Sequence, residues 1–163
     1  MHISILRQRT IYMGLAVAAL VAGCAAPSAP PAPKAEVPSC RAAAGGDALV
    51  GNWLIVRKQK GVAGELRTLF TLHADGTMAY TEQLKRNNKP SQGLSETGCW
   101  EHQQQTLTMR TLHSNGALVN LEDPIYTNQY TIVSATDKTL SLKDTDGASM
   151  TARRMSPGYR LPF

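Results

Sequence analysis

Residues 66–83 read LRTLFTLHADGTMAYTEQ, and this stretch decides the fold. Apolar and polar side chains alternate on both sides of Asp75-Gly76, as they do in β-strands that are buried on one face. Glycine and aspartate accept the backbone angles that tight hairpin turns require. The stretch therefore predicts a β-hairpin with its turn at Asp75-Gly76.

The same alternation continues from Leu49 onward, and no stretch has the periodicity of an amphipathic helix. Asn115-Gly116 and Asp146-Gly147 are further turn signals, and the longest connection is expected at residues 84–96. The pattern predicts about eight strands, at residues 49–58, 66–74, 77–83, 97–103, 106–112, 126–135, 139–144 and 148–155. Closure of such a meander removes the exposed strand edges that invite aggregation. The expected fold class is therefore all-β, a small antiparallel up-and-down β-barrel.

Alternation also predicts which side chains face the barrel interior. The inward positions are Leu66, Phe70, Leu72, Met78, Tyr80, Leu107, Met109, Tyr126, Tyr130, Ile132, Leu140 and Leu142. The side chains expected to line a ligand site are Phe70, Met78, Tyr80, Met109, Tyr126 and Tyr130.

Two features near the C-terminus carry expectations of their own. Arg153-Arg154 lies on the last strand and directs one arginine inward, where it would need a carboxylate partner or an open barrel end. The candidate partners are Glu65, Glu82 and Glu101. The closing apolar side chains are expected to cap one end of the barrel, or alternatively to dock on a partner; they are Tyr159, Leu161 and Phe163.

Residues 1–23 are typical of an export signal, with a basic start and an apolar run too short to span a bilayer comfortably. The run ends in Leu20-Val21-Ala22-Gly23-Cys24, which resembles the lipobox of bacterial lipoproteins. The resemblance implies that Cys24 becomes an N-terminus acylated with chains such as palmitate, which anchor the protein to a membrane. Ala25 stands where an aspartate would resemble an inner-membrane retention signal, so the expected location is the periplasmic face of the outer membrane. An ordinary secretory signal with another cleavage site is the alternative.

Residues 24–47 are expected to form the acylated cysteine and a tether rich in proline and alanine, and residues 48–163 the barrel domain. Five prolines at residues 25–38 are incompatible with helix or sheet. The net charge of +5 falls to +3 when Arg7 and Arg9 leave with the signal. No nucleic-acid partner is therefore expected.

Gly51-Asn52-Trp53 opens the first expected strand and resembles the Gly-x-Trp opening of lipocalins. Gly98-Cys99-Trp100-Glu101 is a second copy, and residues 70–77 add to the likeness with the small lipocalin-like domains of bacterial envelope lipoproteins. The resemblance spans roughly residues 48–155 and implies a barrel that binds a small ligand. The residues expected to have structural roles are Gly51, Trp53, Gly98 and Trp100, with both tryptophans plugging the barrel base.

Cys40 and Cys99 remain once Cys24 is committed to lipid. An exported pair of cysteines is more often a disulfide than a metal or redox site, and the chain has no Cys-x-x-Cys spacing. A disulfide that pins the segment before the first strand to the fourth expected strand is therefore predicted.

No constellation of residues predicts catalysis or metal binding. The chain lacks a Gly-x-Ser-x-Gly element. Three histidines have no partner at metal-ligand spacing and are expected to be solvated strand-end residues, namely His73, His102 and His113. We therefore expect no cofactor, no metal and no enzymatic activity.

Two functions stay open on the sequence alone. In the first, the barrel binds a small apolar or amphipathic molecule. In the second, side chains fill the barrel, and its loops or tail dock an envelope complex or inhibit an extracellular enzyme. A cavity of about 300 Å³ or more would favour the first function, since ligand pockets reach that size.

Overall fold

The computed structural model describes residues 36–58, 60–86 and 92–162. The expected export signal, Cys24 and Phe163 lie outside the described residues. No helix in the described part of the chain is long and apolar enough to cross a membrane.

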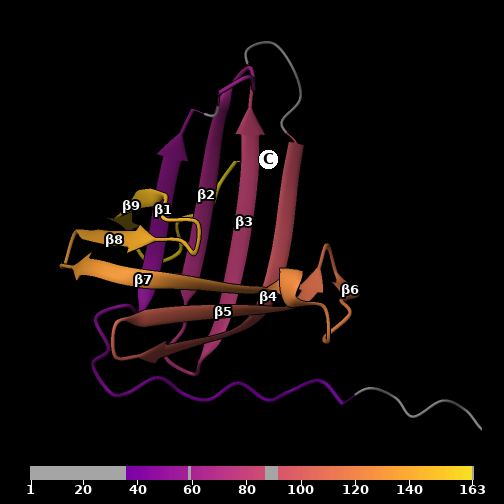
Figure 1. Ribbon diagram of the computed structural model, residues 1–163, viewed down its shortest axis with the longest axis vertical. Helices are drawn as coiled ribbons and strands as arrows, with labels where there is room; N and C mark the ends of the chain where they lie inside the picture. Colours follow the sequence, from indigo (N-terminus) through magenta and orange to yellow (C-terminus); the bar gives the residue numbers. More distant parts are fainter. Residues whose placement is uncertain (1–35, 59, 87–91, 163) are drawn as a thin grey trace, which may run out of the picture. The chain divides into compact units, whose positions relative to one another are not determined.

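One antiparallel sheet accounts for the architecture, and it is closed (Figure 1). Its strands are β1 (Gly51–Arg57), β2 (Glu65–Leu72), β3 (Thr77–Lys85), β4 (Gln92–Gln103), β5 (Thr106–Ser114), β6 (Ala117–Leu118), β7 (Thr127–Ala135), β8 (Thr139–Lys143) and β9 (Ser149–Met155). Apart from the two-residue β6, each strand pairs with its sequence neighbours, and β9 pairs with β1. The result is the eight-stranded up-and-down barrel that the alternation predicts.

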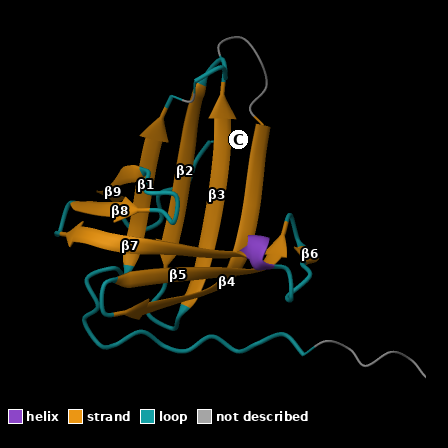
Figure 2. Cartoon of the chain, in the orientation of Figure 1, coloured by secondary structure: helices purple, strands orange, loops and turns teal. Residues whose placement is uncertain are grey.

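Several strand ends differ from the sequence expectation by one or two residues, and two differences bear on the expected site. Strand β4 begins at Gln92 and not at Thr97, so most of the expected loop 84–96 is strand. The error arises because polar residues and a glycine in this part of β4 weaken the apolar alternation. Tyr126 is not in a strand, because it ends a 3-10 helix, η1 (Pro124–Tyr126), which is the only helical turn among the described residues (Figure 2). The turn is favoured by Pro124 and by Asp123, whose side chain accepts a hydrogen bond from the backbone N–H of Ile125.

The core occupies one end of the barrel, which we call the base, where the β2–β3 and β4–β5 turns lie. The opposite end, with the β1–β2 and β3–β4 connections, is the mouth. The buried core residues are Leu49, Trp53, Ile55, Phe70, Leu72, Met78, Trp100, Leu107, Met109, Leu140, Leu142 and Ala152. Most of the predicted inward positions are therefore confirmed, whereas Leu66, although buried, and Tyr126 lie outside this cluster.

Both tryptophans are buried at the base, and each satisfies its indole N–H. Trp53 Nε1 donates to the Leu49 carbonyl at 2.8 Å, and Trp100 Nε1 donates to the His73 carbonyl at 2.8 Å. Gly98 lies at a β-bulge, where an added Cβ would overlap the backbone carbonyl of Arg110. Trp53, Trp100 and Gly98 therefore all lie in close contact with neighbouring backbone.

Arg154 points inward beside Trp53, but its partners are not carboxylates. The guanidinium lies 4.1 Å from the centroid of the Trp53 ring. It donates hydrogen bonds to the carbonyl oxygens of Val50 and Ala48 at 2.7 and 2.6 Å. The expected pairing with Glu65, Glu82 or Glu101 is therefore wrong, because a ring face and two strand-end carbonyls already stabilise the cation.

The C-terminal tail, residues 156–162, does not cap a barrel end. Leu161 and Tyr159 pack on Leu54 and Leu69, which point outward from β1 and β2. The Gln83 amide on β3 donates to the Pro162 carbonyl. The tail thus crosses the outer face of three strands, because the outward leucines offer it an apolar surface.

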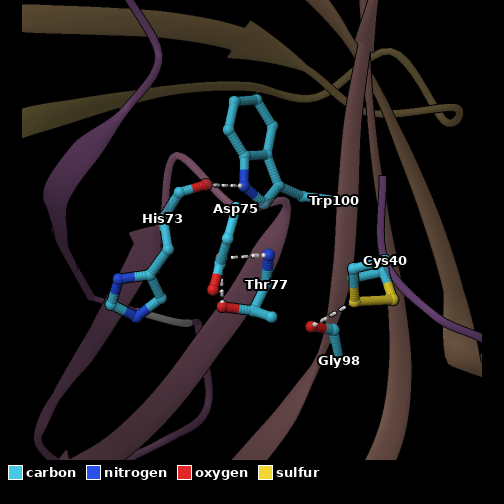
Figure 3. Close-up of a disulfide and its surroundings, with 7 residues drawn as sticks. Cys40, His73, Asp75, Thr77, Gly98 and Trp100 are labelled. Atoms are coloured by element: carbon cyan, nitrogen blue, oxygen red, sulfur yellow. Dashed lines mark hydrogen bonds between the residues drawn. A yellow bond between two sulfur atoms is a disulfide. The ribbon is translucent and has the colours of Figure 1, made fainter. Parts of the chain in front are cut away.

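The segment before β1 is held against the base. Cys40 and Cys99 form the predicted disulfide, with their Cα atoms 5.2 Å apart (Figure 3). Ala43 donates its backbone N–H to the Ala74 carbonyl at 3.0 Å. Gly76 has φ +82, and an added Cβ there would overlap the Arg41 carbonyl. This close approach requires a glycine in the β2–β3 turn.

Candidate functional site in the barrel interior

The inward-facing side chains change character between the base and the mouth. Beyond the apolar core, the interior of β2 and β3 carries Thr68, Tyr80 and Glu82. The Tyr80 hydroxyl donates to Glu82 Oε2 at 2.9 Å, and the Thr68 hydroxyl approaches the same oxygen at 3.3 Å. Glu82 is therefore held in one orientation by two hydroxyl donors.

A second carboxylate lies on the neighbouring strand. Glu96 on β4 is the register partner of Tyr80, and it accepts a hydrogen bond from the buried Thr111 hydroxyl at 3.1 Å. Arg57, at the end of β1, brings its guanidinium to 4.0 Å from Glu82 Oε2. That arginine side chain is half exposed, so water screens the pair and weakens it.

The environment of this polar cluster also acts on two tyrosines. Burial raises the pKa of Tyr80 far above its ordinary value, and the negative charge of Glu82 raises it further. Burial likewise raises the pKa of Tyr130, with Asp144 adding to the shift and Arg57 opposing it. Both phenols are therefore neutral hydrogen-bonding groups at neutral pH.

Titration of the tyrosines should reveal this cluster. The folded-state pKa of Tyr80 is above its ordinary value of 10.0, so Tyr80 stabilises the fold below pH 10 and this contribution is lost as the pH rises above it. We expect late ionisation in an ultraviolet absorbance titration, with one late step absent in Tyr80→Phe. Glu82→Gln should move that step to lower pH. An unchanged titration curve in Glu82→Gln would contradict the assigned contact.

The six residues expected to line a ligand site lie in three different environments. Phe70, Met78 and Met109 are at most 3% exposed and belong to the packed core. Tyr80 and Tyr130 are partly buried against the core on its mouth side. Tyr126 is the last residue of η1, so it lies before the start of β7, and its side chain is not part of the core.

Sequence reasoning missed Thr68, Glu96 and Thr111, and it named Glu82 only as a candidate partner of the inward arginine. The signal that could have found Glu82 is its position two residues after Tyr80, which places both on one face of a strand. Apart from one arginine of the last strand and its candidate partners, no charged residue was expected inside the barrel, because alternation was followed through apolar residues.

The histidines do not form a metal site with other residues that the structure describes. No group of three or more His, Cys, Asp or Glu side chains that could hold a metal occurs among these residues. His102 is not simply solvated, since its Nδ1 lies 2.8 Å from Asp47 Oδ2 and its Nε2 lies 2.9 Å from the Gln104 carbonyl. The pair fastens the segment before β1 to the β4–β5 hairpin.

No family model matches the chain, and the comparison with curated proteins gives no match. The lipocalin-like identity therefore stays a prediction, carried by the two Gly-x-Trp elements and compatible with the barrel. The geometry of the interior is the basis for a functional proposal.

Proposed function

We propose that this protein is a non-enzymatic binding module whose barrel takes a small amphipathic molecule through its mouth. The apolar part of the ligand would rest on the core near Tyr80 and Tyr130. Its polar part would donate hydrogen bonds to Glu82 and Glu96. A primary amine fits this pair of acceptors best, because ammonium groups carry donors and the complementary charge.

One observation carries the proposal: the Glu82 side chain points into the barrel, and 28% of that side chain is exposed to solvent. Solvent therefore reaches this carboxylate. The same carboxylate is oriented by the hydroxyls of Tyr80 and Thr68. An oriented, solvated charge beside partly buried aromatic rings is typical of a ligand site.

The rival function, a filled barrel that acts through its outer surface, is supported by the base. There the tryptophans and their neighbours are fully buried, so this half is a packed core. A purely structural interior gains little from charged groups near the mouth, because burying carboxylates costs free energy. The polar cluster thus favours the binder.

We also propose export and lipid anchoring at Cys24, with the barrel at the periplasmic face of the outer membrane. Support comes from the lipobox-like sequence Leu20-Val21-Ala22-Gly23-Cys24 and from the Cys40–Cys99 disulfide, since disulfides persist in oxidising compartments. Mass spectrometry of the membrane-extracted protein would test the anchor. An N-terminal peptide that begins at any residue other than an acylated Cys24 would contradict it.

The binding proposal is tested on residues 36–163, which contain the whole barrel, its core and its disulfide. Fluorescence titration with dansylcadaverine, an amphipathic amine, should show saturable binding. Glu82→Gln should weaken that binding about tenfold, because a charge-assisted hydrogen bond contributes about 1.5–3 kcal/mol.

The matched control is Glu101→Gln, because Glu101 is an exposed carboxylate on the outer face of β4 near the base. It should bind the probe as the unaltered chain does. No saturable binding, or equal losses in the two variants, would contradict an interior site.

A further inference from the structure

A groove of about 740 Å³ lies outside the barrel, between the C-terminal tail and the outer face of β1–β4. One row of its floor joins Asn52, Thr71 and Ala79 across three strands. A second row places Thr81 of β3 opposite Ser95 of β4. The volume is within the range of pockets that hold drug-sized ligands.

The groove results from the sizes of the outward side chains. The tail rests on two large ones, Leu54 and Leu69, and is fastened at Gln83. The floor positions beside them carry only small or short side chains, mainly threonine, alanine and serine. A tail held up by leucines cannot fill the space over these short residues, so a hollow remains beneath and beside it.

The walls of the groove are amphipathic and carry charge of one sign. Met155, Tyr159 and Leu161 give it apolar surface. No aspartate or glutamate lines it, and its basic lining residues are His73, Arg154 and Arg160. Arg160 is the one that offers its cation to the groove, since the Arg154 guanidinium already binds the Val50 and Ala48 carbonyls beside Trp53. Arg160 is exposed and makes no ion pair with any residue that the structure describes.

We propose that this groove is a second binding site, which takes an amphipathic monoanion such as an aliphatic carboxylate. The hydrocarbon part would lie along the tail wall and the short side chains of the floor. The carboxylate would meet Arg160, whose planar guanidinium suits bidentate recognition of carboxylates. The site is separate from the barrel interior and does not depend on a ligand there.

The opposite charges of the two sites make them separable by experiment. Glu82 and Glu96 in the interior favour a cation, whereas the groove lining favours an anion. Anilinonaphthalene sulfonate, an amphipathic anion, is therefore the probe for the groove. On residues 36–163 it should bind saturably, and decanoate should displace it while decylamine should not.

Two variants assign that binding to the groove. Ala79→Trp places a large ring on the floor and should weaken probe binding at least about tenfold, since the ring occupies the ligand's volume. Arg160→Gln should weaken it about threefold or more, with the loss shrinking as salt rises. Glu82→Gln should leave it unchanged.

Val133→Trp is the control for an added surface tryptophan, because Val133 is 64% exposed on β7, away from the groove floor on β1–β4. Backbone amide shifts on adding decanoate provide a measurement that needs no variant, and we expect them at Ala74, Ser95 and Tyr159. Binding that survives Ala79→Trp, or amide shifts confined to the barrel interior, would overturn the groove. Loss of amine binding alone would count only against the interior site.

Discussion

Replacing Cys40 with serine is expected to lower the free energy of unfolding by about 4 kcal/mol, as the chain-entropy model gives for a loop of this length. The disulfide joins residues 59 apart and holds the segment before β1 against β4. Denaturant unfolding of residues 36–163, followed by circular dichroism, measures the change. Each additional contact of that segment, such as His102 with Asp47, should also weaken once the crosslink is gone.

The controls rest on the fact that either cysteine variant removes the same disulfide. Cys99→Ser should cost the same as Cys40→Ser, and the double variant should cost no more than either, since one bond is removed in all three. The unaltered chain under reducing conditions should match them. Ser39→Ala, beside Cys40 at an exposed position, should be nearly neutral. Additive losses in the double variant would contradict the Cys40–Cys99 bond.

Much of the fold follows from local pattern, because each strand carries its own signal. Alternation fixes which face of a strand is buried, and turn residues such as Asp75-Gly76 fix where the chain reverses. The sequence order of pairing then leaves closure through β9 and β1 as the way to protect both edges. The disulfide was predictable because only two cysteines remain after Cys24.

The site was less predictable because its members depend on pairings across strands. Glu96 belongs to the interior only because β4 begins early and aligns with Tyr80. Arg154 binds the carbonyls of Val50 and Ala48, which lie near it only because the segment before β1 crosses the base. The outer groove depends on where the tail lies, and apolar tail residues alone do not distinguish a barrel end from a barrel wall.

Replacing Trp53 with alanine is expected to destabilise the barrel by about 3–5 kcal/mol, the range for removing a large aromatic side chain from a core. Trp53 is fully buried, so its removal leaves a cavity at the base. The Leu49 carbonyl loses its indole donor, and the Arg154 guanidinium loses the ring face beneath it. Trp53→Phe should lower the free energy of unfolding by less than Trp53→Ala does, because it keeps an aromatic ring and loses only part of the side chain and the N–H donor.

Val56→Ala is the matched control on the same strand, because Val56 points outward and is 46% exposed. It should change the free energy of unfolding by less than about 0.5 kcal/mol, as surface substitutions usually do. Circular dichroism is the appropriate signal, since tryptophan fluorescence itself changes when Trp53 is removed. If Trp53→Ala proved as mild as Val56→Ala, the base could not be the packed core, and the proposed division of the barrel into a filled base and a binding mouth would fail with it.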